Sequence, residues 1–148
     1  MEKTSETNTL DSICKTIHAV GDVSDYHVAE LVERFGQRAD KALEALNESR
    51  SKKYVFNPSG RIVWIVVGKE RDYLVMPSIG YCSCDDFYYQ FDHGHVCYHI
   101  IAQKLAEATD RFDLFEDDDQ FYDILIREWK TTEEQPRKKK TEDSDDTV

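Results

Sequence analysis

The cysteines and histidines of this chain are concentrated in one short segment. Residues 81–101 read YCSCDDFYYQFDHGHVCYHII and hold three of the four cysteines and three of the five histidines. Cys82 and Cys84 form a C-x-C pair, and after twelve further residues Cys97 and His99 form a C-x-H pair. Three thiolates and one imidazole are typical donors for Zn²⁺ in tetrahedral structural sites. The pattern therefore predicts one structural zinc ion bound by these four residues.

Backbone geometry limits how the four side chains can meet. Residues two apart on an extended segment point to the same side, which brings the sulfurs of Cys82 and Cys84 together. Residues two apart on a regular helix point in nearly opposite directions. A helix is therefore expected to begin at or just before His99, with Cys97 in the turn that enters it.

One alternative ligand set stays open. A helix that began earlier would present His95 and His99, four residues apart, on one face and would leave Cys97 out. Gly94 opposes such an early start, and a thiolate such as that of Cys97 is a strong zinc ligand. In the preferred arrangement His93 and His95 are exposed loop residues.

The sequence predicts no enzyme, no catalytic residue and no cofactor-binding residue. Four protein ligands leave no position on the ion for water or substrate, so the zinc would be structural. The segment 66–70, VVGKE, has a Gly-Lys pair after a strand, but it lacks the glycine-rich loop and the Ser or Thr of a phosphate-binding loop. Neither G-x-G-x-x-G nor G-x-S-x-G occurs.

The composition indicates one compact intracellular domain. The chain has 148 residues, 40% of them apolar, and no apolar run approaches the roughly 20 residues that span a membrane. No signal peptide is apparent at the N-terminus. We expect a soluble protein, in the nucleus of a eukaryote or the cytoplasm of a prokaryote, where thiols stay reduced and clustered cysteines bind metal.

The charge balance argues against tight, autonomous binding to nucleic acid. The formal net charge is −11, with 30 acidic and 19 basic residues, which raises the energy of approach to a phosphate backbone. A local basic patch can overcome this repulsion, because charges beyond about 8 to 10 Å are screened at physiological salt.

Three amphipathic helices are expected before the metal-binding segment. Their apolar stripes are Leu10, Ile13, Ile17 and Val20; Val28, Leu31, Val32 and Phe35; and Ala39, Ala42, Leu43 and Leu46. Asn8 is expected to cap the first helix and Gly21 to end it. Ser24 is expected to open the second, which Gly36 ends. Cys14 lies on the first stripe, where it is expected as a small buried apolar residue.

Three antiparallel strands are expected next. Tyr54 to Phe56 lead into residues 57–60, Asn-Pro-Ser-Gly, which match the preferences of a type I turn. Ile62 to Val67 are apolar at every position, so both faces of that strand should be covered. Tyr73 to Met76 form the third strand.

The remaining elements complete an α+β fold. The helix after the metal-binding segment runs to about Ala108, and Phe112, Leu114 and Phe115 are expected in a short connection. Acidic residues 116–119 are expected to open a last helix, because they suit the positive end of its dipole. Its expected stripe is Phe121, Ile124, Leu125 and Trp129. The predicted fold thus has N-terminal helices, an antiparallel sheet of about three strands, a zinc knuckle leading into a helix, and a C-terminal helix.

These motifs resemble a known family. C-x-C, twelve residues and C-x-H, placed after strands and before the helix HIIAQKLA, resemble a SWIM zinc finger. ERFG, KALEALN, NPSGR and YCSC resemble the small SWIM-domain subunit of Shu-type recombination complexes. The resemblance runs from about Ser24 to Ala108. It does not cover residues 1–23 or the C-terminal tail. We expect an N-terminal helical extension over 1–23, a SWIM zinc finger domain with flanking helices over 24–130 and, from its polar and charged composition, a disordered tail over 131–148.

The resemblance implies a non-enzymatic accessory factor of homologous recombination and DNA repair. Members of that family pair with a RecA-like paralogue and help recombinase filaments assemble on single-stranded DNA. This chain would form a heteromer with such a paralogue or recombinase and reach single-stranded DNA indirectly or weakly. The metal ligands carry over to Cys82, Cys84, Cys97 and His99. An alanine just past the C-x-H is also typical, and Ala102 matches it.

Two other functions stay open. A direct nucleic-acid-binding zinc finger would use a basic patch made of Arg50, Lys52, Lys53 and Arg61. The aromatic residues at 87, 88, 89 and 91 would then stack on unpaired bases, although packing around the metal is the favoured role for them. A protein-interaction adaptor outside DNA repair is the second alternative, which the absence of a RING-type ligand series weakens.

Overall fold

The fold of the chain is α+β, as predicted. A computed structural model describes residues 5–69, 71–77, 81–84 and 96–130. Over these residues it has five α-helices and one mixed sheet of five strands, where the sequence predicted about three. The expected tail, Gly94, His93, His95 and the aromatic residues at 87–91 lie outside the described residues. No helix in the described ranges is long and apolar enough to cross a bilayer.

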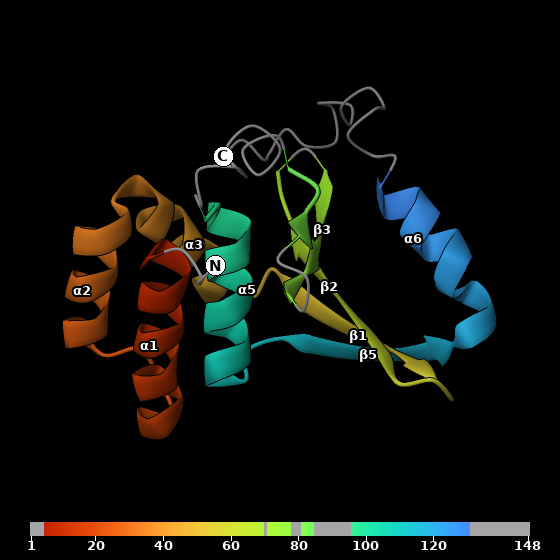
Figure 1. The fold of residues 1–148 in the computed structure, drawn as a ribbon, viewed down its shortest axis with the longest axis horizontal. Helices are drawn as coiled ribbons and strands as arrows, with labels where there is room; N and C mark the ends of the chain where they lie inside the picture. The colour runs from red at the N-terminus through yellow and green to blue at the C-terminus, as the bar shows by residue number, and fades with distance from the viewer. Residues whose placement is uncertain (1–4, 70, 78–80, 85–95, 131–148) are drawn as a thin grey trace.

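Four helices pack together on one side of the sheet (Figure 1). They are α1 (Ser5–Val20), α2 (Asp25–Phe35), α3 (Gln37–Asn47) and α5 (Tyr98–Thr109). Their buried apolar side chains form one continuous cluster with residues of the sheet, which we call the helix-side core. Leu10, Ile13 and Ile17 of α1 belong to it, and Cys14 packs against it with a pKa raised by burial to about 12.

The ends of these helices agree with the sequence in most places. Gly21 ends α1 with φ +99°, and Gly36 lies between α2 and α3 with φ +60°. Asn8 was expected as a cap, but α1 already begins at Ser5, so Asn8 lies inside the helix.

Three residues of the expected apolar stripes are not in the core. Val20 is 67% exposed, and Val28 and Val32 are each 36% exposed. A single helix face contacts the neighbouring helices, and these three positions fall at the margin of that face or beyond it. Leu31 and Phe35 supply the buried contacts of α2.

A buried histidine fixes the start of α2. The Ser24 N–H donates to His27 Nδ1 (3.1 Å), and the His27 N–H donates to Ser24 Oγ (3.3 Å), which is a capping box with histidine in place of the usual glutamate. Since Nδ1 accepts, the ring proton lies on Nε2 and is donated to Thr16 Oγ1 of α1 (3.0 Å). The ring therefore joins α2 to α1.

Replacing His27 by alanine is expected to lower the free energy of unfolding by about 1 to 3 kcal/mol, because a helix cap and a partly buried interhelical hydrogen bond are lost. Urea unfolding followed by circular dichroism measures this change. The matched control is His18→Ala, since that ring is exposed and makes one long contact of 3.4 Å to the Ala108 carbonyl. Equal unfolding midpoints for the two variants would contradict the role assigned to His27.

The sheet has the order β4-β3-β2-β1-β5. Its strands are β1 (Ser51–Asn57), β2 (Arg61–Val67), β3 (Asp72–Met76), β4 (Tyr81–Cys82) and β5 (Asp113–Asp118). The first four pair antiparallel, whereas β5 runs parallel to β1 and places Lys52 opposite Asp113. In Figure 1, β5 leads from the end of α5 along β1 towards α6 (Tyr122–Lys130).

The prediction that both faces of β2 are covered is confirmed for its centre. Trp64 and Val66 belong to the helix-side core. Val63 and Ile65 belong to a second core, against which Leu125, Ile126 and Trp129 of α6 pack. Ile62, at the start of the strand, is 47% exposed.

The β1–β2 hairpin forms as predicted, but its turn differs. A type I turn over 57–60 would be closed by a hydrogen bond between its first and fourth residues. Instead the Gly60 N–H donates to the Phe56 carbonyl (2.6 Å), so the turn is one residue longer. The Asn57–Pro58 peptide bond in this turn is cis, and Gly60 has φ +80°.

The segment after α5 was predicted wrongly. Residues 113–118 form strand β5 and not a connection, and the acidic residues close this strand and do not open a helix. A 3-10 turn (Asp119–Phe121) follows, and α6 begins at Tyr122. The carboxylates are accommodated because β5 is an edge strand whose side chains largely face solvent. Of the expected α6 stripe, Phe121 is 41% and Ile124 is 54% exposed.

Candidate metal centre

The candidate metal-binding residues lie in two pairs, one at and just after the end of β4 and the other at the start of α5. Cys82 is the last residue of β4, where it lies opposite Val75 of β3. Ser83 then bonds to β3 in both directions. Its N–H donates to the Leu74 carbonyl and its hydroxyl accepts from the Leu74 N–H, each at 3.0 Å. These bonds hold Ser83 against β3. The side chains on either side of it, Cys82 and Cys84, both lie close to Cys97 and His99 at the start of α5.

The second pair stands at the beginning of α5, as expected from the spacing. Cys97 is the N-cap, with extended φ and ψ of −76° and 164°, and the helix proper begins at Tyr98. Cys97 therefore lies outside the helix and His99 inside its first turn. The first helical hydrogen bond runs from the Ile101 N–H to the Cys97 carbonyl (3.2 Å).

The structure brings all four predicted residues together. The ligand atoms of Cys82, Cys84, Cys97 and His99 lie within 4.8 Å of one another, and all four side chains are buried. Ligands bonded to one tetrahedral zinc at about 2.0 to 2.3 Å lie roughly 3.3 to 3.8 Å apart, so a small inward movement completes the site. We call these four residues the metal cluster. His95, the alternative to Cys97, lies outside the described residues.

The His99 ring shows that the cluster fits a metal. His99 is 5% exposed, and within the described residues neither of its ring nitrogens has a hydrogen-bond partner. Its ring lies against those of Tyr73 and Tyr98, with centroid distances of 3.9 and 4.0 Å. A buried nitrogen without a partner costs about 1 to 3 kcal/mol, which coordination to a metal ion would remove.

The pKa values of the three thiols in the metal cluster are shifted in different directions. Burial raises the pKa of Cys82 well above its ordinary value, and hydrogen bonds to Cys84 and Cys97 raise it further. The hydrogen bonds from Cys82 and Cys97 lower the pKa of Cys84 below its ordinary value. For Cys97 the hydrogen bond with Cys82 lowers the pKa, but that with Cys84, together with burial, raises it overall.

Zinc affinity is therefore expected to rise with pH. Zinc binds thiolates, so its uptake releases the protons that Cys82 and Cys97 hold at neutral pH. Two released protons strengthen binding by up to about a hundredfold per pH unit while the pH is below both thiol pKa values. Both pKa values lie above the ordinary 9.0, so the rise continues through neutral and mildly alkaline pH. Titration calorimetry in buffers of different ionisation enthalpy counts these protons; an affinity independent of pH would contradict the protonation states.

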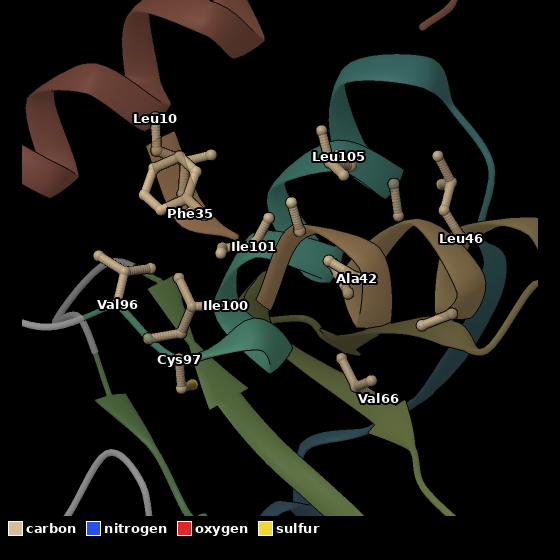
Figure 2. Close-up of a cluster of buried hydrophobic side chains, with 14 of the residues drawn as sticks. Leu10, Phe35, Ala42, Leu46, Val66, Val96, Cys97, Ile100, Ile101 and Leu105 are labelled. Atoms are coloured by element: carbon tan, nitrogen blue, oxygen red, sulfur yellow. The ribbon is translucent and has the colours of Figure 1, made fainter. Parts of the chain in front are cut away.

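A buried part of α5 attaches the cluster to the helix-side core. Ile101, Ala102 and Leu105 are fully buried there. Figure 2 shows Val96, Cys97 and Ile100 at one edge of this core, with Leu10 and Phe35 nearby. Ala102, the alanine just past the C-x-H pair, has no exposed surface, so it packs closely at the start of α5.

An ion pair that the sequence did not reveal fixes the residue before Cys97. Arg38 of α3 donates to both carboxylate oxygens of Glu6 in α1 (3.0 and 2.8 Å) and to the Val96 carbonyl (2.6 Å). Glu6 in turn accepts from the Val96 N–H (2.8 Å). We call these contacts the Glu6–Arg38 clamp. No motif signals it, because its members are brought together only by the fold.

The structure does not gather the predicted basic patch. Lys52 and Lys53 are consecutive in β1 and therefore point to opposite faces of the sheet. Arg50 precedes β1 and is paired with Glu44 and Glu48. Arg61 lies at the other end of the hairpin, 3.7 Å from Asp119. These four residues do not form one surface.

The fold and the metal cluster define a small α+β protein with a buried Cys₃His metal-binding site. The chain is 30% identical over 108 residues to the zinc finger SWIM domain-containing protein 7 homolog of Dictyostelium discoideum, which covers 70% of this chain and 69% of that protein. The chain belongs to the SWIM zinc finger family. It is also 37% identical over 91 residues to an uncharacterized protein of Archaeoglobus fulgidus, covering 61% of this chain and 73% of that protein. No family model and no solved structure matches the chain.

Proposed function

We propose that the protein is a non-enzymatic, zinc-dependent accessory factor of homologous recombination and DNA repair. The observation that carries this proposal is the buried cluster of four donors in a chain of the SWIM zinc finger family. A shell filled by Cys82, Cys84, Cys97 and His99 leaves no position for a substrate, so the ion stabilises the fold. Such a protein would then act by binding other macromolecules through its surface.

The partner in this proposal is a RecA-like paralogue or recombinase, and the pair supports recombinase assembly on single-stranded DNA. The chain offers apolar surface for such a partner near β5. Leu114 is 55% exposed and Phe115 is 40% exposed, at consecutive positions of the edge strand, so each face of the sheet has one of the two side chains at this edge. Exposed apolar side chains of this kind, with acidic residues around them, suit a partner whose facing surface is apolar and basic.

Co-expression with each RecA-type ATPase of the host tests the partner. We expect one of them to co-purify in a stoichiometric complex and the pair to speed recombinase assembly on single-stranded DNA. Leu114→Arg is expected to weaken this complex, whereas Val20→Arg, at an even more exposed apolar position (67%), is the matched control. Failure of every RecA-type ATPase to bind the zinc-loaded chain would overturn the proposal.

The zinc content of the purified protein tests the structural role of the ion. We expect one zinc ion for each chain by inductively coupled plasma mass spectrometry of protein purified without chelator. A metal content near zero in a folded protein would overturn the structural role of the ion. Direct binding to nucleic acid through the basic patch has no support in the structure, since that patch is divided between the two faces and the two ends of the hairpin.

A further inference from the structure

A pocket lies beside the metal cluster. It has a volume of about 300 Å³ and is lined by Lys41, Glu44, Arg50, Lys69, Tyr73 and Tyr98. We call it the tyrosine pocket. Its two tyrosines are the residues whose rings lie against the His99 ring, so this metal ligand helps to hold one wall of the pocket.

The tyrosine pocket is positive although the protein is acidic. It has three cationic side chains and one carboxylate, in a chain of net charge −11. Lys41 and Lys69 are exposed, and within the described residues neither is in an ion pair with a carboxylate. Arg50 differs, because Glu44 and Glu48 hold its guanidinium. The two lysines therefore supply the charge that is available to a ligand.

Cations also lie near the aromatic walls. Lys41 Nζ is 5.6 Å from the centre of the Tyr98 ring, and the Arg71 guanidinium is 5.3 Å from that of Tyr73. Phenol hydroxyls, ammonium groups and guanidinium groups all donate hydrogen bonds. Such donors, grouped in a hollow of this size, suit a phosphate group with the sugar that carries it.

We infer that the tyrosine pocket binds the phosphate group of a nucleotide, supplied by single-stranded nucleic acid. Cationic side chains combined with aromatic ones are the arrangement by which proteins bind single strands without sequence preference. The inference rests on the proposed function and deepens it, because it gives single-stranded DNA a contact point on this subunit. The overall acidity keeps this contact weak unless a partner binds the same strand.

Fluorescence anisotropy of labelled dT20 with the zinc-loaded full chain tests the inference. Lys41→Gln with Lys69→Gln removes two charges from the pocket, and Lys15→Gln with Lys52→Gln removes two elsewhere. We expect the pocket variant to bind about tenfold or more weakly at low salt, and its slope of log affinity against log salt to fall by about 1.4. The control variant should stay within about threefold of the unmodified chain.

Competition separates the sources of the phosphate. Unlabelled dT20 is expected to displace the probe at far lower concentration than thymidine monophosphate or inorganic phosphate, since only the strand presents several phosphates. Equal displacement by the monophosphate would assign the pocket to free nucleotides and overturn the single-strand part of the inference. Equal weakening in both double variants, or no binding by the unmodified chain, would overturn the pocket as a site. A RecA-type partner that still binds would leave the proposed function intact in either case.

Discussion

Replacing Cys97 by serine is expected to abolish stoichiometric zinc binding and to unfold the junction between β4 and α5. Cys97 is one of the four residues that could hold the ion, and it is the N-cap of α5. Structural zinc contributes about 10 to 16 kcal/mol in small zinc domains, which is comparable to the total stability of about 5 to 15 kcal/mol of a typical domain. Removal of the ion by a strong chelator is expected to have the same effect, because it removes the same binding energy.

Cys14 provides the matched control for this experiment. Its thiol is half-buried on α1 and is not one of the four clustered donors. Cys14→Ala should keep one zinc ion for each chain and a cooperative thermal transition. Zinc content and the helical signal in circular dichroism are measured on both variants. If Cys97→Ser retained full zinc and an unchanged melting curve, the assignment of the four ligands would be wrong.

Replacing Arg38 by alanine is expected to weaken zinc binding without removing a ligand. Arg38 donates to Glu6 and to the Val96 carbonyl, so the clamp fixes the residue next to Cys97. Loss of a group that orients a metal ligand typically lowers affinity by about 10 to 100-fold. The lost charge-assisted hydrogen bonds, at side chains 23% and 32% exposed, are expected to lower the free energy of unfolding by about 2 kcal/mol.

A double-mutant cycle distinguishes the clamp from a general loss of stability. Glu6→Gln and Arg38→Gln should each weaken zinc binding, and the double variant should lose much less than the sum of the two. Arg34→Ala, at an exposed arginine of α2, is the control and should leave the zinc affinity unchanged. Additive effects in the cycle would show that the two residues do not act through one another.

The metal cluster was predictable because its information is local. The C-x-C and C-x-H spacings indicate which side chains face the same way on a strand or at a helix start. Cys97 and His99 have the expected backbone, and Cys82 ends strand β4, whereas Cys84 lies in a bend just beyond the strand. Only the approach of the C-x-C pair to the C-x-H pair depends on the tertiary fold. The clamp was not predictable, because Glu6, Arg38 and Val96 come from three segments and carry no spacing signal.

Strand β5 was missed for a related reason. Residues 113–118 are mostly acidic, and acidic residues are uncommon inside strands and frequent at helix starts. Their strand conformation comes from pairing with β1, a partner far earlier in the chain. Local and long-range information also differ for the hairpin. Residues 57–60 predict that a turn forms, but they do not predict that the turn is closed by the hydrogen bond from the Gly60 N–H to the Phe56 carbonyl.

The parallel pairing of β1 with β5 also bears on how the protein is made. While the chain emerges from the ribosome, β1 can pair with β2 along one edge. Its other edge has no strand to pair with until residues 113–118 have been synthesised. A nascent chain therefore exposes an unpaired strand edge until almost all of the described fold has been synthesised. The sheet is therefore completed only when the C-terminal region has left the ribosome and β5 pairs with β1, and metal binding alone does not complete it.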